Sequence, residues 1–380
     1  MKRITIVVLT LLVVSCQSHV QIDATPSASS QVSMTRTPSA TTMLPQPIMD
    51  TNHENIVLKD SSGVTMIYDV EERSTHTIAL SEDCQLVGRI LAAICRTDKG
   101  LVSIDLQSGL QMVIPVPSLN GWSLTTGERF LYFGEPSGNQ YVLYRYDLER
   151  RTTESLGAYN PAGWVIAPEF SDFDVPLIGT RLDETSELVP ELYQLTSDGA
   201  YQRIGPDLRW SITGFSWSPT EALLGIGASD VSSDAPSYCA ATLFITYRVG
   251  AHEVNQIAHA PVDTCYTDFS IVARSIWSPD GQKVVLVPSK TYQVLDQELC
   301  IVEIDAASQK CLAVLQPNER LGRVAWSPDS QSLVYIVENR TSGDADLRTI
   351  SIDGLSRTTI LAKIASGQDI IDLIWLRARP

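Results

Sequence analysis

The chain has 380 residues, with 28 Lys and Arg against 44 Asp and Glu, which gives a formal net charge of −16 at pH 7. This acidic balance argues against nucleic acid or anionic lipid headgroups as the main partner. The 44% of hydrophobic residues can build a sizeable core, and no internal apolar run reaches the roughly 18 residues of a membrane-spanning helix. The five His leave little for a His-built metal site, so neither a metal nor a cofactor is expected.

Residues 1–15 have the pattern of a secretory signal peptide. A basic start precedes an apolar stretch of 11 residues, which is too short to cross a bilayer. The stretch ends in Val13-Val14-Ser15-Cys16, which resembles the bacterial lipobox, where a small residue precedes the Cys that is lipidated after cleavage. The resemblance implies that Cys16 carries the lipid and anchors the protein to a cell membrane on the extracytoplasmic side. The alternative is an ordinary signal peptide with an incidental Cys.

Residues 16–53 are expected to form a disordered linker that begins with the lipidated Cys16. Of the 37 residues that follow this Cys, 16 are Ser, Thr or Pro. Such a composition has too little apolar surface to offset the entropy of the chain. The linker would let the folded part, at 54–380, stand away from the membrane.

From residue 54 onward the chain repeats a strand–turn–strand pattern. The clearest copy is 276–287, which contains Trp-Ser-Pro-Asp-Gly, and related copies lie at 325–336, 216–226 and 121–133. Pro suits a type I turn in this place, followed by Asp and Gly. The β-branched and aliphatic run after each turn predicts a strand.

A second pattern of short alternating strands recurs seven times, at intervals that average about 47 residues. Four short strands in 40–50 residues is roughly the period of a propeller blade. The copies lie at 66–69, 102–105, 144–147, 193–196, 244–247, 302–305 and 350–353.

These repeats resemble TolB-type β-propeller repeats, which are WD-type repeats with a Trp-Ser-Pro-Asp-Gly hallmark. The resemblance implies an all-β β-propeller, and the spacing predicts seven four-stranded blades. A strand expected at 370–376 has no partner after it, so it should close the ring by pairing in the first blade near 55–58. In such repeats Trp217, Trp277 and Trp326 pack between blades. The family's N-terminal α/β domain has no counterpart here, so no Tol-system role is carried over.

The six Cys that remain after Cys16 fall into three local pairs, each bracketing a candidate hairpin or the outer strands of one blade. An even number suits disulfides in an oxidising compartment. Zinc is not favoured because the sequence has no Cys-x-x-Cys and no nearby His. The predicted disulfides are Cys84–Cys95, Cys239–Cys265 and Cys300–Cys311.

The sequence contains no recognisable set of catalytic residues. The Gly-x-Ser-x-Gly elbow of the hydrolases that carry such propellers is absent. His19 and His53 fall in the linker, and His76, His252 and His259 fall in outer hairpins where a solvated His is the ordinary reading. The alternative is a pair of carboxylates, among the 44 Asp and Glu residues, that lines the central channel and acts as a catalytic pair.

The sequence therefore predicts a non-enzymatic, monomeric lipoprotein whose propeller binds a protein or peptide of the cell envelope. Rigid blades present variable loops at the channel mouth and on each face, and such surfaces support recognition without chemistry. The alternatives are a carbohydrate-active or other hydrolase that uses channel carboxylates, and a structural or sensory part of an envelope complex.

Overall fold

The computed structural model describes residues 52–377 with internal gaps, all within one compact unit, Ala40–Pro380. The signal peptide, nearly all of the linker, Cys16, Cys239, His19 and His252 lie outside the described residues. No helix among the described residues is long and apolar enough to cross a membrane. The gaps are 82, 98–99, 117–121, 126–127, 138–139, 160–177, 183–187, 196–200, 204–210, 230–242, 250, 252, 261–263, 267–275, 291–297, 313–314, 354–358 and 365–368.

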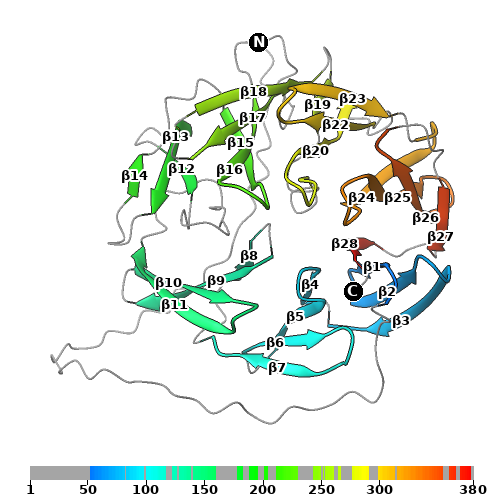
Figure 1. Ribbon diagram of the computed structural model, residues 1–380, viewed down its shortest axis with the longest axis horizontal. Helices are drawn as coiled ribbons and strands as arrows, with labels where there is room; N and C mark the ends of the chain where they lie inside the picture. Colours follow the sequence, from blue (N-terminus) through cyan, green and yellow to red (C-terminus); the bar gives the residue numbers. More distant parts are fainter. Residues whose placement is uncertain are drawn as a thin grey trace, which may run out of the picture. The chain divides into compact units, whose positions relative to one another are not determined.

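The strands of this unit form antiparallel sheets that are arranged around a ring (Figure 1). Five sheets among the described residues have four strands. The first is β28 (Ile370–Leu376), β1 (Asn55–Asp60), β2 (Val64–Asp69) and β3 (Ser74–Ala79); the second is β4 (Cys84–Val87), β5 (Ala92–Thr97), β6 (Gly100–Asp105) and β7 (Gln111–Ile114). The third is β8 (Trp122–Leu124), β9 (Phe130–Ser137), β10 (Gln140–Asp147) and β11 (Thr152–Tyr159). The others are β15 (Ser211–Trp217), β16 (Leu223–Ser229), β17 (Leu243–Arg248) and β18 (Glu253–His259), and β24 (Glu319–Trp326), β25 (Ser332–Asn339), β26 (Ala345–Ser351) and β27 (Thr359–Ile364).

The remaining described sheets are smaller. Two have three strands and one has two strands. They are β12 (Ile178–Leu182), β13 (Leu188–Leu195) and β14 (Tyr201–Arg203); β20 (Lys283–Leu286), β22 (Leu299–Glu303) and β23 (Ser308–Leu312); and β19 (Thr264–Tyr266) with β21 (Pro288–Lys290).

The expected ring of seven four-stranded blades is wrong, because only five of the described sheets have four strands. The clearest departure lies in the repeat that matches the hallmark best. There Trp277 forms a single bridge to Val284 instead of a strand ladder. The run after the turn is split at Val287: β20 pairs with β22, whereas β21 pairs with β19. β21 starts at Pro288, and Pro cannot donate a hydrogen bond to a ladder, which favours the break.

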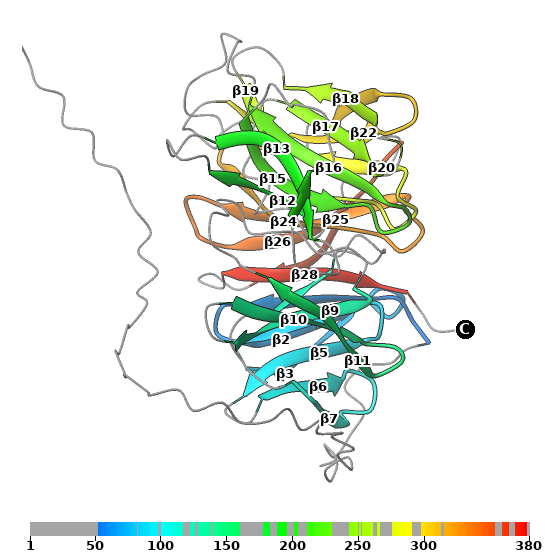
Figure 2. The ribbon, with the colours of Figure 1, turned by 90° about the vertical axis from the view of Figure 1, so that its left-hand side faces the viewer.

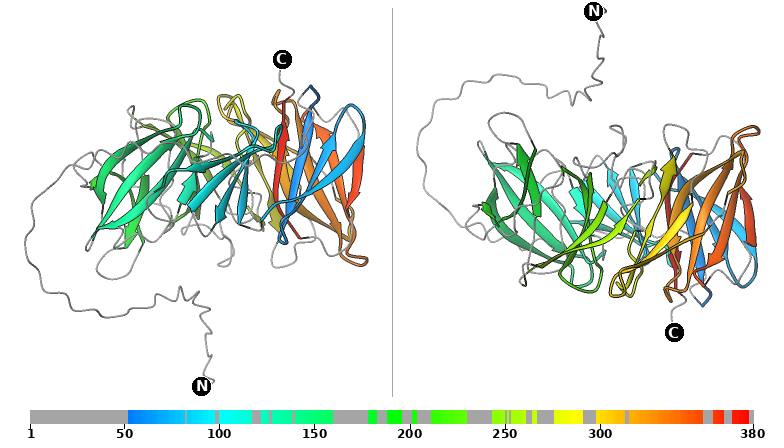
Figure 3. Two further views of the ribbon diagram at one scale, coloured as in Figure 1. Left: turned by 90° about the horizontal axis from the view of Figure 1, so that it is seen from below. Right: turned by 90° about the horizontal axis from the view of Figure 1, so that it is seen from above.

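The expected closing strand is present. β28 pairs with β1 in antiparallel register, with Ile56 opposite Trp375 and Leu58 opposite Leu373. The two strands, 310 or more residues apart in the chain, lie side by side in red and blue (Figure 3). Figure 2 shows β28 at full length next to the sheet that contains β24 and β26. The C-terminal strand thus joins the first sheet as its innermost strand and pairs the edge that β1 would otherwise leave open.

Six clusters of buried apolar side chains form the described core, and five of them combine residues of neighbouring sheets. Trp277 and Trp326 belong to two of these seams and are only 4% and 5% exposed. Each indole N–H crosses to the preceding sheet: Trp277 Nε1 donates to the Ser216 carbonyl, and Trp326 Nε1 donates to the Ile276 carbonyl, both at 3.2 Å. The expected packing of these two Trp between sheets is confirmed.

Candidate functional site

One cavity is lined by residues from the strands of two sheets and from the turns next to the strands of four others, so parts of six sheets converge on it. Its volume is about 500 Å³. We call it the mouth pocket. Its lining is Gly88, Arg89, Glu128, Pro219, Thr220, Trp277, Pro279, Ala325, Trp326, Pro328, Leu373, Ile374, Trp375, Leu376 and Arg377.

The repeated Ser-Pro-Asp turns position the prolines of this pocket. The Ser327 hydroxyl donates to Asp329 Oδ1 at 2.5 Å and accepts the Ser332 N–H at 2.8 Å. This bond to Ser327 lowers the pKa of Asp329, so its carboxylate stays charged and keeps the turn closed. Ser278 makes the same bonds with Asp280 and the Lys283 N–H. The turns therefore hold Pro328 and Pro279 in fixed places at the pocket.

Trp375 differs from the two buried Trp beside it. It is partly exposed, and its Nε1 donates to the Glu54 carboxylate at 3.1 Å rather than to a backbone carbonyl. Burial raises the pKa of Glu54, and the neighbouring Glu71 raises it further, while the Trp375 bond opposes both. The pocket therefore has one Trp that is partly exposed to water and whose indole N–H is bound to a carboxylate.

The charged part of the pocket comes from the turns after β4 and β8. The Arg89 N–H donates to Glu128 Oε2 at 2.8 Å, and the Arg89 Nε donates to Glu149 Oε1 at 2.7 Å. Gly88 fits closely here, because a Cβ at this position would lie 3.1 Å from Leu376 and 3.3 Å from Glu128. Arg377, at the end of β28, is exposed. The pocket thus combines apolar walls with two cationic side chains and one anionic side chain.

A second cavity of about 490 Å³ lies beside the mouth pocket, between the sheets β4–β7 and β8–β11. It shares Arg89 and also contains Asp105, Tyr146 and Arg151. Asp105 is engaged by its own turn, where it accepts the N–H groups of Gln107 and Ser108.

Two of the three predicted disulfides are formed in the structure, each across a register pair of neighbouring strands. Cys84–Cys95 joins β4 to β5, and Cys300–Cys311 joins β22 to β23. Cys239 lies outside the described residues, so its pairing with Cys265 stays a prediction.

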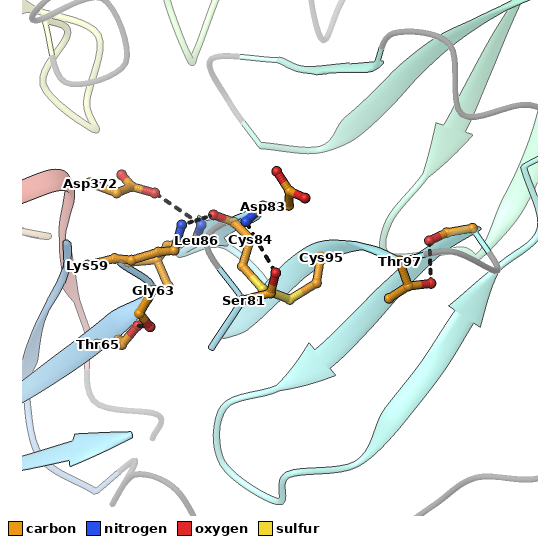
Figure 4. Close-up of a disulfide and its surroundings, with 11 residues drawn as sticks. Lys59, Gly63, Thr65, Ser81, Asp83, Cys84, Leu86, Cys95, Thr97 and Asp372 are labelled. Atoms are coloured by element: carbon orange, nitrogen blue, oxygen red, sulfur yellow. Dashed lines mark hydrogen bonds between the residues drawn. A yellow bond between two sulfur atoms is a disulfide. The ribbon is translucent and has the colours of Figure 1, made fainter. Parts of the chain in front are cut away.

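A buried Lys that the sequence does not predict lies near the first disulfide (Figure 4). Lys59 on β1 is 0% exposed, and its Nζ donates to the Cys84 carbonyl at 2.7 Å. Asp372, opposite it on β28, accepts the Leu86 N–H at 3.1 Å. These two bonds tie the closing strands to β4. Nothing in the sequence around Lys59 indicates that its side chain is buried.

The structure also places the predicted His residues. His76 lies exposed on β3, and His259 on β18 contacts the Ala260 carbonyl at 2.6 Å. His53 was expected in the linker, but its Nδ1 lies 2.7 Å from Asp69 Oδ2 at the end of β2. The ordered unit therefore includes this residue.

No protein-family model matches the chain, and no curated protein matches it. Solved structures do. Oligogalacturonate lyase from Vibrio parahaemolyticus is 12% identical, with 88% of this chain and 89% of that chain covered and a TM-score of 0.53. The β-propeller domain of the Trilobed protease from Pyrococcus furiosus is 11% identical, with 85% and 98% covered and a TM-score of 0.53. TolB from Acinetobacter baumannii is 15% identical, with 84% and 81% covered and a TM-score of 0.43.

At these identities the likeness to the Vibrio and Pyrococcus structures shows the fold alone: the chain is a β-propeller. TolB proteins are among its structural neighbours. The Pyrococcus domain has an open velcro topology, whereas in this chain β28 pairs with β1.

Proposed function

We propose that this protein is an extracytoplasmic lipoprotein whose β-propeller binds a protein or peptide at the mouth pocket. The observation that carries the proposal is the pocket itself, which has a volume of about 500 Å³ and is lined by strands and turns that belong to six sheets. Its Trp375 and prolines can receive an apolar side chain, and Arg89 and Arg377 can receive a carboxylate. Hydrogen-bonded turns hold Arg89, Pro279 and Pro328, and β28 holds Trp375, so little conformational entropy is lost when these groups bind a partner.

The carboxylates around the pocket are already engaged in structural bonds, which favours binding over hydrolysis. Glu128 accepts a backbone N–H, Asp329 holds its turn, and Glu54 accepts the Trp375 indole. Catalysis by a carboxylate pair needs one acid and one base that both reach the substrate. The similar structures include a lyase and a protease domain as well as TolB, so the fold does not decide the matter.

The membrane anchor rests on the lipobox-like Val13-Val14-Ser15-Cys16. Cys16→Ala should move the protein from the membrane fraction to soluble or unprocessed forms, because the lipid can no longer be attached. Equal membrane retention of Cys16→Ala and wild type in a carbonate wash would contradict the anchor.

The binding proposal is tested with two matched charge reversals in the full chain. Arg89 lies at the pocket and pairs with Glu149, and Arg320 pairs with Glu338 at the other end of β24 from Trp326. Both Arg side chains are about half exposed, at 42% and 51%. Wild type and Arg320→Glu should capture the same partner from envelope extract, and Arg89→Glu should lose it. Retention by Arg89→Glu would place the binding surface elsewhere.

A further inference from the structure

Three potential metal ligands converge where the chain enters β1. One ligand atom each from His53, Asp69 and Glu71 lies within 4.8 Å of the others. They come from both sides of the β1–β2 hairpin, because Asn55 is the register partner of Asp69. The Asp69 side chain is 7% exposed, the His53 side chain is 30% exposed, and Glu71 is exposed. An ion between them would thus have one face open to water.

Each of the two carboxylates is oriented by hydrogen bonds from backbone N–H groups. The Glu72 N–H donates to Asp69 Oδ1 at 2.7 Å, which leaves Oδ2 directed at His53. The Glu54 N–H donates to both oxygens of Glu71, at 3.2 and 3.0 Å. The Asn55 side-chain amide donates to the His53 backbone carbonyl at 2.9 Å, which holds the main chain of His53 beside β1. Such outer bonds fix ligand orientation in metal sites.

We propose that His53, Asp69 and Glu71 bind one transition-metal dication, with Zn²⁺ as the fitting probe. One imidazole nitrogen and two carboxylates form a mixed N and O donor set that suits Zn²⁺ better than Ca²⁺, which takes six to eight oxygens. Binding replaces the present His53–Asp69 hydrogen bond by two bonds to one ion. Three protein ligands leave a coordination position for water or for a group of a bound molecule.

The ion would lie beside the mouth pocket. Glu54, whose N–H orients Glu71, accepts the indole N–H of the pocket residue Trp375. The other cluster of this kind in the described residues, Glu298 with Cys300 and Cys311, offers no thiolate because its two Cys form a disulfide. The inference does not depend on the proposed function, since it needs only these contacts.

The test uses two adjacent and chemically identical substitutions, Glu71→Gln and Glu72→Gln, in the full chain. Both residues are exposed in the turn after β2, but only Glu71 is in the cluster. The metal-free proteins are titrated with ZnCl₂ by calorimetry, and the absorption spectrum of the Co²⁺ form reports the ligand set. We expect one Zn²⁺ per wild-type chain, an affinity at least about tenfold lower in Glu71→Gln, and a change below about twofold in Glu72→Gln.

Three results would overturn the site. If wild type takes up no Zn²⁺, then His53 and Asp69 form only an ordinary hydrogen-bonded pair. The site would also be wrong if both variants lost the same affinity for Zn²⁺, or if wild type bound Ca²⁺ more tightly than Zn²⁺. His53→Gln provides a second, independent variant that should also weaken binding and change the Co²⁺ spectrum.

Discussion

The closing strand β28 should contribute a large share of the stability of the propeller, and Leu373 tests this directly. Leu373 is 3% exposed and lies opposite Leu58 on β1. It packs in a cluster that also contains Val334, Ile336 and Leu347 from the neighbouring sheet. Truncation to Ala therefore removes contacts within the first sheet and across its seam.

Leu-to-Ala changes at fully buried sites cost about 2–5 kcal/mol, because transfer energy is lost and a cavity remains. Unfolding entropy near 2.1 cal/mol/K per residue gives about 0.7 kcal/mol/K for a unit of roughly 330 residues. Leu373→Ala should therefore lower the Tm by about 3–7 °C. Leu110 is 37% exposed, and its replacement by Ala should cost less than about 0.5 kcal/mol.

Circular dichroism of the full chain during thermal unfolding measures both variants beside wild type, with urea unfolding as a second readout. A Tm of Leu373→Ala equal to that of Leu110→Ala would show that the β28 seam opens before the rest unfolds. The claim that the C-terminal strand holds the ring closed would then be wrong.

Further changes test other parts of the structure. Gly225→Ala should destabilise the protein by about 1–3 kcal/mol in urea unfolding, because a Cβ there would lie 2.9 Å from the Phe244 ring and 3.0 Å from the Trp277 ring; an unchanged midpoint would contradict this tight seam. Burial raises the pKa of Glu319, but the Arg348 guanidinium and the Gln316 N–H outweigh it, so the folded pKa is lowered. The stability that Glu319 contributes is therefore complete above its unfolded pKa of about 4.3 and is lost as the pH falls through the folded pKa. Glu319→Gln should be less stable than wild type at pH 7 and lose less Tm between about pH 5 and pH 3, and equal slopes would refute the assignment. Peptide mapping without reduction should find Cys239 linked to Cys265, whereas alkylation of both as thiols would refute that bridge.

The parts of the fold that the sequence predicted are those governed by local patterns. Period-2 alternation at 66–69 and 102–105 lies in β2 and β6. The orphan strand at 370–376 became β28, and two local Cys pairs became register partners. Each of these depends on alternation, turn residues or short sequence separation, which a single chain displays directly.

The parts that it could not predict depend on neighbours distant in the chain. The four-strand regularity fails around 276–290, where Trp277 forms one bridge, β20 pairs with β22, and β21, which begins at Pro288, pairs with β19 instead. Lys59 can be buried because its ammonium group donates a hydrogen bond to the Cys84 carbonyl on another sheet. In the mouth pocket, Trp375 could be found from its spacing of 49 residues after Trp326, but Arg89 and Glu128 come from turns without a motif.

Site-specific photocrosslinking in living cells tests the binding claim most directly. A photoreactive phenylalanine analogue replaces Arg377 at the mouth pocket in one variant and Arg320 at the opposite end of β24 in another. Both positions are on the surface, so both variants should fold. We expect a discrete crosslinked protein adduct from position 377 and none from position 320. No adduct from 377, or the same adducts from both positions, would contradict a binding site at the mouth pocket.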